Sequence, residues 1–181
     1  AKVRAHACSK ETILECVELG VDLIDHGDEV DERCIEAMAK AGTFWVPSQQ
    51  TPRLLVDLGY GDKGGVLAGQ VASIGRMLPI AHEAGVRILI GDDYSGFFRD
   101  MIDDDPLDHQ VGNYGRELAW YGALEDITPE MVMSWGTKNP GEMLVDPPAK
   151  AGVIAPGALA DLIVVDGDPL ADLSIFARPE Q

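Results

Sequence analysis

Three short apolar runs of the chain end in side chains that can hold a metal ion. His6 and His26 each lie at the end of one run, and Asp93 follows the run 87–90. Apolar runs of this length are typical of buried strands. Imidazole and carboxylate groups together suit zinc or a similar divalent ion. Because chemistry collects at the carboxyl ends of barrel strands, we predict that these three side chains converge on one divalent metal.

Each of these residues also has an ordinary structural explanation. A single histidine at a strand end can bond to the backbone or pack in the core, and an aspartate can cap the following loop. Asp93 also competes with its neighbour Asp92 for the role of ligand. The placement of all three residues on equivalent ends of repeating strands favours the metal site over three separate explanations.

The first 93 residues alternate between strand and helix patterns. Apolar runs predict strands over 2–7, 21–25, 43–46 and 86–90, and helical spacing predicts helices over 10–19, 31–41 and 66–83. This alternation predicts parallel strands joined by right-handed crossovers, as in barrels and doubly wound sheets. The glycine-rich segment 52–65 predicts a loop, either a lid or a binding loop. The absence of a glycine-rich phosphate motif leaves nucleotide binding without support.

The rest of the chain changes in character. Residues 94–110 are irregular and acidic, and helices are predicted from 107 or 112 to 124, from 129 to 135 and from 139 to 144. The pair Pro147–Pro148 marks a boundary, so we predict two domains, 1–148 and 149–181. Two runs in the tail, 152–157 and 160–166, predict short strands and therefore a small β piece attached to the α/β body.

Composition narrows the class of protein. Hydrophobic residues make up 46% of the 181 residues, which is enough for a globular chain, and a net charge of −17 opposes binding to nucleic acid. No apolar run approaches the roughly 20 residues that cross a bilayer, and no signal peptide is recognised. The chain has no CxxC pair among Cys8, Cys16 and Cys34. We therefore expect free thiols in the reducing cytoplasm, with Cys8 either in the core or lining a pocket.

Five motifs of the chain occur together in one known family. They are His6-Ala7 before a helix, Asp25-His26-Gly27, Gly91-Asp92-Asp93, Thr137-Lys-Asn-Pro140 and the segment 152–170, of which the tail segment is the most specific. On these motifs the sequence resembles the C-terminal half of a metal-dependent amidohydrolase, in the branch that contains imidazolonepropionase and Xaa-Pro dipeptidase (prolidase)-like enzymes. The resemblance covers nearly all of the chain.

The resemblance implies a fold and a set of roles. The fold would be the strand-five-to-eight half of a (β/α)8 TIM-type barrel, with the tail forming part of a small β-sandwich. His6 and His26 would be metal ligands, and Asp93 would be both a ligand and the catalytic acid and base. Asp92 departs from the threonine or serine usual in the family and adds negative charge beside the site. The family's His-x-His motif is absent, so we expect a piece of a longer protein, inactive alone and dependent on a second copy or on the missing half.

The function implied is hydrolysis of C–N bonds in amides, cyclic amides or dipeptides by metal-activated water, with one or two zinc ions in the complete enzyme. Two alternatives stay open: a deaminase of the same superfamily, and a non-catalytic piece that only assembles or binds. We expect a small-molecule substrate and neither nucleic acid nor membrane as a partner. Arg116 could bind a substrate carboxylate or form an ordinary helix-surface salt bridge. The candidate substrate-binding residues are Trp45, Gln49, Tyr60, Asp92, Tyr94 and Arg116.

Overall fold

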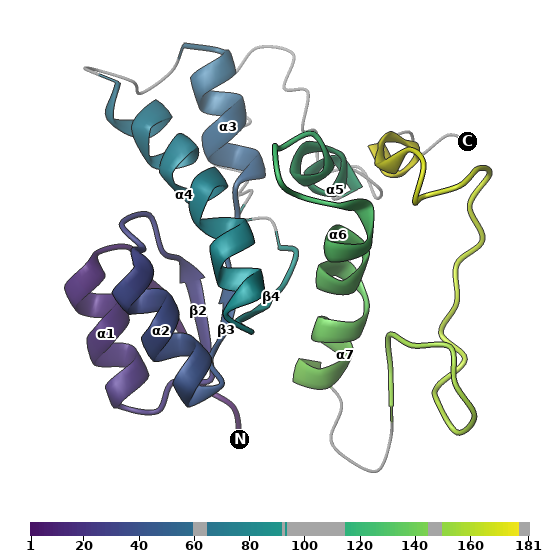
Figure 1. Ribbon diagram of the computed structural model, residues 1–181, viewed down its shortest axis with the longest axis horizontal. Helices are drawn as coiled ribbons and strands as arrows, with labels where there is room; N and C mark the ends of the chain where they lie inside the picture. The colour runs from purple at the N-terminus through teal and green to yellow at the C-terminus, as the bar shows by residue number, and fades with distance from the viewer. Residues whose placement is uncertain (60–64, 92, 94–114, 145–149, 178–181) are drawn as a thin grey trace.

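In the residues that the structure describes, four strands form one parallel sheet in the order β1-β2-β3-β4 (Figure 1). The computed structural model describes residues 1–59, 65–91, 93, 115–144 and 150–177. The strands are β1 Arg4–Ala7, β2 Leu23–His26, β3 Phe44–Val46 and β4 Arg87–Ile88. All three pairings are parallel, which confirms the predicted crossover pattern. The carboxyl ends of the four strands therefore lie along one edge.

Three of the helices between the strands lie where the sequence predicts them: α1 Lys10–Glu18, α2 Glu32–Ala41 and α4 Val66–Glu83. A further helix, α3 Gln50–Asp57, was not predicted. Ser9 caps α1 by accepting a hydrogen bond from the Thr12 amide, and Asp31 caps α2 in the same way through the Cys34 amide. Gly42 ends α2 with a φ of 74°, a left-handed conformation that glycine adopts without strain.

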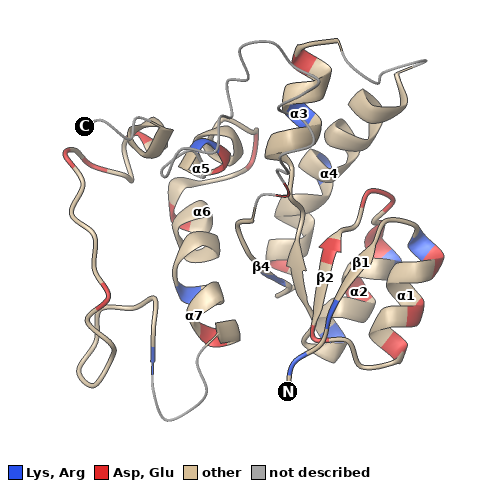
Figure 2. Ribbon diagram, turned by 180° about the vertical axis from the view of Figure 1, so that it is seen from behind, with Lys and Arg blue, Asp and Glu red and all other residues tan. Residues whose placement is uncertain are grey.

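The two faces of the sheet are packed differently. Helices α1 and α2 cover one face, and the view from behind shows β1 and β2 in front of them (Figure 2). On the helix side, Ile24, Trp45 and Ile88 belong to the main hydrophobic core. A second buried cluster, formed by Leu23, Phe44, Val46 and Leu89, is packed against Met143 of α7. The strands β2 and β3 are therefore buried on both faces, as expected for parallel strands, whereas Arg4 and His6 of β1 are exposed.

The second half of the described chain is helical and is joined to β4. Its helices are α5 Gly115–Gly122, α6 Pro129–Gly136 and α7 Lys138–Leu144. The side-chain amide of Asn139 donates to the Ile88 carbonyl at 2.7 Å, and the Ile90 amide donates to the Trp135 carbonyl at 3.3 Å. These bonds fix the α6–α7 pair against the strand that leads to Asp93. Within the described residues, no helix has both the length and the apolar character needed to cross a bilayer.

Two sequence predictions are wrong. Part of the predicted loop 52–65 is the helix α3, because Pro52 lies in its first turn, where backbone amides have no partner within the helix. The tail predicted as two strands contains no strand between 150 and 177, and the only bridge described there joins Lys150 to Ala158. A strand needs a neighbour for its backbone groups, and none is described beside the tail.

As a result, no β-sandwich is present in the described residues. Ile163 and Val164 of the tail are 81% and 99% exposed. The predicted domain boundary falls within 145–149, outside the described residues, so the division into two domains stays a prediction.

Candidate metal and catalytic site

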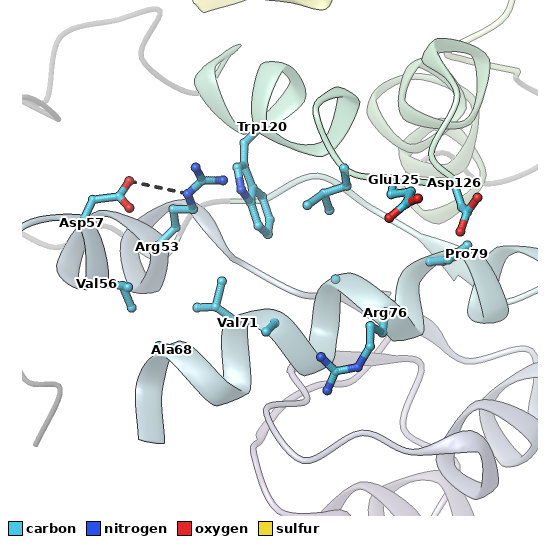
Figure 3. Close-up of a pocket in the computed structure, with 13 residues that line it drawn as sticks. Arg53, Val56, Asp57, Ala68, Val71, Arg76, Pro79, Trp120, Glu125 and Asp126 are labelled. Atoms are coloured by element: carbon cyan, nitrogen blue, oxygen red, sulfur yellow. Dashed lines mark ion pairs between the residues drawn. The ribbon is translucent and has the colours of Figure 1, made fainter. Parts of the chain in front are cut away.

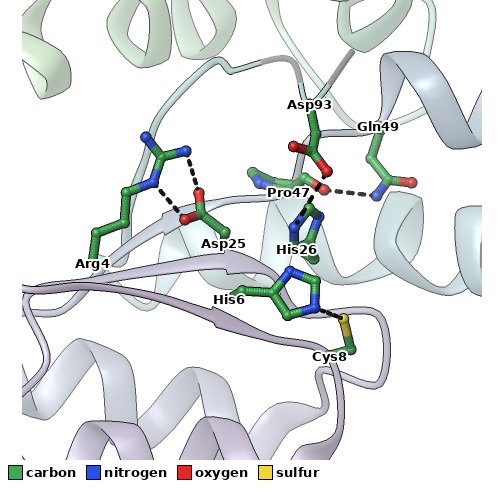
Figure 4. Close-up of polar contacts among 8 residues, drawn as sticks. All are labelled: Arg4, His6, Cys8, Asp25, His26, Pro47, Gln49 and Asp93. Carbon is green, nitrogen blue, oxygen red and sulfur yellow. Dashed lines mark hydrogen bonds and ion pairs between the residues drawn. The ribbon is translucent and has the colours of Figure 1, made fainter. Parts of the chain in front are cut away.

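The three predicted ligands lie together at the carboxyl edge of the sheet (Figure 4). His6 comes from β1, His26 is the last residue of β2, and Asp93 follows β4. The rings of His6 and His26 meet edge to face with their centroids 4.5 Å apart. His26 Nε2 lies 3.7 Å from the Oδ2 atom of Asp93. Residues separated by up to 87 positions thus share one small region, as the spacing of the strand ends predicts.

The backbone of His26 is held in an unusual conformation. Its φ is 68°, in the left-handed region, and that of Gly27 is 73°. Strict alternation along β2 would turn His26 to the helix side together with Ile24; instead, its ring lies against that of His6. The indole Nε1 of Trp45 donates to the His26 carbonyl at 2.8 Å. Strained backbone of this kind collects at functional sites and persists only where the surroundings enforce it.

An ion pair between exposed Arg4 and buried Asp25 lies beside the two histidines. Asp25 is opposite His6 in the β1–β2 register and is only 6% exposed. Arg4 donates two hydrogen bonds to its carboxylate, from Nε to Oδ2 at 2.5 Å and from Nη2 to Oδ1 at 2.8 Å. This pairing with Asp25 raises the pKa of Arg4. Because Arg4 binds both oxygens of Asp25, this carboxylate is less available to a ligand than that of Asp93, whose side chain is 69% exposed.

The Cys8 thiol lies against the same site. Its Sγ atom is 3.4 Å from Nε2 of His6. Burial raises the pKa of the Cys8 thiol to about 12, so the neutral thiol dominates at pH 7 and is a weak metal ligand. Cys8 therefore touches the site through His6, and whether it lines a pocket stays a prediction.

The donor atoms are of the types that bind a divalent metal, but their arrangement matches a metal site only in part. Two ligands of a tetrahedral zinc ion, each ~2.0–2.2 Å from it, lie ~3.4 Å from one another. The 3.7 Å between His26 Nε2 and Asp93 Oδ2 is close to that separation. Within the described residues, however, no group of three or more His, Cys, Asp or Glu side chains is arranged so that it could hold a metal ion, and this includes His6, His26 and Asp93. The three residues could supply part of a coordination sphere, and their role as ligands stays a prediction.

The predicted substrate-binding residues are found in several environments. Trp45 is fully buried in the core and supports the His26 backbone, which argues against direct contact with a substrate. Gln49 is 1% exposed, and its side-chain amide donates to the Pro47 carbonyl at 2.8 Å. Arg116 lies in α5 and already takes part in an interaction. The three remaining candidates, Tyr60, Asp92 and Tyr94, lie outside the described residues, so their role stays a prediction.

One buried acid at this edge was missed by sequence reasoning. Glu117 of α5 is 0% exposed and accepts hydrogen bonds from the backbone amides of Gln49 and Gly91. A glutamate in the first turn of a helix is common at protein surfaces, so its residue type gave no reason to single it out. The only local signal was Tyr121, one helical turn later, whose hydroxyl also donates to Glu117.

A separate cavity of about 430 Å³ lies among α3, α4 and the end of α5 (Figure 3). Arg53 and Trp120 face one another at its wall, with the guanidinium carbon 5.4 Å from the ring centroid. None of the three predicted metal ligands lines this cavity. It is therefore distinct from the site at the edge of the sheet.

Comparison with known proteins agrees with this geometry. Residues 1–181, the whole chain, match the model of the amidohydrolase family. A search among curated proteins found no match.

Solved structures share the fold. The ochratoxinase of A. niger gives a TM-score of 0.81 at 22% identity, over 99% of this chain and 38% of that one. A prolidase complexed with N-methylphosphonate-L-proline gives a TM-score of 0.73 at 29% identity, and the match covers 97% of this chain and 41% of that one. A Xaa-Pro dipeptidase with methionine bound in its active site gives a TM-score of 0.72 at 26% identity, and the match again covers 97% of this chain and 41% of that one.

This chain thus spans at most 41% of the length of each of these three structures. Its parallel sheet of four strands corresponds to part of their barrels. Since the family model matches every residue, the chain belongs to the amidohydrolase family.

Proposed function

We propose that this chain supplies part of the active site of a metal-dependent hydrolase that cleaves C–N bonds. The observation that carries the proposal is the meeting of His6, His26 and Asp93 at the carboxyl edge of the sheet. In barrel enzymes this edge holds the catalytic groups. The four strands would then be strands five to eight of a (β/α)8 barrel, and segment 149–181 part of a small second domain.

His6 and His26 would hold a divalent metal, most simply zinc, with Asp93 beside it. The ion would supply Lewis acidity and a more acidic water. Asp93 has its side chain 69% exposed, so a substrate can reach it, and Nε2 of His26 lies 3.7 Å from its Oδ2 atom. Asp93 would take the proton from the attacking water and then donate it to the leaving nitrogen. The pair of Arg4 and Asp25 would join β1 to β2 beside the site during these steps.

The substrate class follows from chemistry and from the relatives. One similar structure is a prolidase complexed with N-methylphosphonate-L-proline, and another is a Xaa-Pro dipeptidase with bound methionine. The name Xaa-Pro dipeptidase refers to dipeptides whose acyl group is joined to the proline nitrogen, and the ligand of the prolidase is a phosphonate derivative of proline. We therefore propose N-acyl amino acids and prolyl dipeptides as the first substrates to test. The remaining ligands would come from a second polypeptide segment, either the rest of a longer chain or a partner.

Zinc binding by the purified chain tests the proposal. Elemental analysis of a size-exclusion peak of known mass gives zinc per chain, and calorimetric titration gives its affinity. We expect binding that is lost in His26→Ala. The matched control is His82→Gln, which removes a histidine of α4 whose ring contacts Trp135 and no residue of the site. Equal zinc content in His26→Ala and the unchanged chain would overturn the assignment of His26 as a ligand.

Activity needs a separate test. Prolyl dipeptides are incubated with the zinc-loaded chain, alone and mixed with the N-terminal half of a related prolidase, and released proline is measured. Release in either mixture that disappears in Asp93→Asn supports the proposed acid and base role. Release that persists in Asp93→Asn contradicts it, and release of ammonia alone would indicate a deaminase.

A further inference from the structure

The exits of two neighbouring strands share one buried acceptor. Glu117 of α5 is 0% exposed. Its Oε1 atom accepts from the Gln49 amide at 2.8 Å and from the Tyr121 hydroxyl at 2.9 Å. Its Oε2 atom accepts from the Gly91 amide at 3.0 Å. A single carboxylate on a helix therefore binds backbone amides from two different parts of the sheet.

Both amides lie where the chain leaves the sheet. Gln49 follows the end of β3, and Gly91 follows the end of β4 and precedes Asp93 by two residues. Gly91 is also confined on its other side, because a Cβ atom there would meet Cγ1 of Val46 at 2.6 Å. The backbone at Gly91 is thus held between a hydrogen bond and a close packing contact.

We propose that Glu117 is a positioning residue that fixes the exit of β4 and thereby sets Asp93 beside His26. This inference rests on the proposed function, because Glu117 affects the site only if Asp93 has the role proposed above. Only one residue, Asp92, separates Gly91 from Asp93, so a displacement of Gly91 also changes where that carboxylate can lie. The side chain of Asp93 is 69% exposed, so surrounding packing restrains it little. Its position depends mainly on the backbone that carries it.

The chemistry of the bonds suggests the variant. Glu117→Gln keeps the size and shape of the side chain but replaces one acceptor oxygen with an NH₂ donor. The remaining oxygen is expected to keep the two bonds of Oε1, which leaves the Gly91 amide facing a donor. Tyr121→Phe is the matched control, since it removes a hydrogen bond to the same carboxylate and leaves both backbone amides bound. If Glu117→Gln does not fold, Glu117→Asp keeps the charge but is too short to reach both amides.

The first readout is hydrogen exchange of individual backbone amides by NMR, which needs no metal. We expect the Gly91 amide to exchange faster in Glu117→Gln than in Tyr121→Phe or the unchanged chain. The second readout is zinc affinity. Removing a residue that orients a metal ligand without binding the metal itself typically lowers the affinity ~10–100-fold. We expect this decrease in Glu117→Gln and an affinity in Tyr121→Phe close to that of the unchanged chain.

Several results would overturn the proposal. Equal exchange of the Gly91 amide in both variants would show that Glu117 does not hold it. Faster exchange of the Gly91 amide in Glu117→Gln with unchanged zinc affinity would show that Glu117 does not affect the metal site. An equal loss of zinc affinity in Glu117→Gln and Tyr121→Phe would indicate a general packing effect.

If the unchanged chain binds no zinc without the second segment, the NMR signals of the His26 ring take the place of zinc affinity in deciding about Glu117. A change in these signals in Glu117→Gln alone supports the positioning role, and signals that match those of the unchanged chain refute it.

Discussion

Replacing Gly27 with alanine tests how firmly the His26 backbone is held. Gly27 has a φ of 73°, and a Cβ atom there would meet Nε1 of Trp45 at 2.8 Å. The indole cannot move away easily, because Trp45 is 0% exposed and its Nε1 donates to the His26 carbonyl. Gly27→Ala should therefore introduce backbone strain and displace the group that anchors His26.

Gly20 offers a matched control. Its φ is 78°, almost the same as that of Gly27, but a Cβ atom at Gly20 would meet nothing within 4 Å. Left-handed backbone costs a non-glycine residue ~1–2 kcal/mol, and this cost should apply to both substitutions. In Gly27→Ala the disturbed indole bond adds ~1–3 kcal/mol, the usual cost of an unsatisfied buried polar group. We therefore expect Gly20→Ala to lower the free energy of unfolding by about 1–2 kcal/mol and Gly27→Ala by about 2–5 kcal/mol.

Equilibrium urea unfolding followed by circular dichroism measures both changes. For a chain of this size, each kcal/mol should lower the melting temperature by ~2–4 °C, so thermal unfolding gives a second reading. The substitution Gly27→Ala, made also in a Trp45→Phe background, completes a double-mutant cycle. Phenylalanine lacks the Nε1 atom, so the extra cost of Gly27→Ala should largely disappear there. Equal losses for Gly20→Ala and Gly27→Ala in the natural background would refute the idea that a rigid indole holds His26.

Three further predictions concern single side chains. The hydrogen bond from Lys10 lowers the pKa of Asp31 from 3.8 to about 2. The ionised Asp31 should therefore stabilise the fold above about pH 4, and this stabilisation should be lost as the pH falls towards 2. Urea unfolding midpoints of Asp31→Asn, measured over this pH range, should lack that part of the pH dependence. Because burial raises the pKa of Cys8 to about 12, Cys8 should react with a disulfide reagent at pH 8 far more slowly in the folded chain than in urea, and equal rates measured by mass spectrometry would contradict this. Asn139→Ala should cost ~1–3 kcal/mol, because the side-chain amide of Asn139 is buried and donates to the Ile88 carbonyl; a urea midpoint equal to that of the unchanged chain would count against that bond.

Local signals predicted the first half of the fold well. Ser9 and Asp31 each precede a helix and accept from an amide three residues later, so residue type alone marks both helix starts. The strand ends follow from where apolar runs stop. Because parallel strands share a carboxyl edge, the meeting of His6, His26 and Asp93 is also predictable from the order of residues along the chain.

Features that depend on distant contacts were not predictable in this way. Pro52 reads as a helix breaker, yet the first turn of a helix tolerates it. The tail has strand-like residues around Ile163, but a strand forms only beside a neighbour. Glu117 gains its role from amides far away in the chain, and Tyr121, one helical turn later, is the only local residue that hints at its burial.

The hydrogen bonds of Glu117 also bear on the order of folding. Arg4 and Asp25, which join β1 to β2, are 21 positions apart, whereas Gln49 and Glu117 are 68 positions apart. Closing a longer loop costs more chain entropy and proceeds more slowly. We therefore expect the first three strands and their helices to associate early and α5 to dock late. The edge that carries His26 and Asp93 would then acquire its final shape only when α5 arrives.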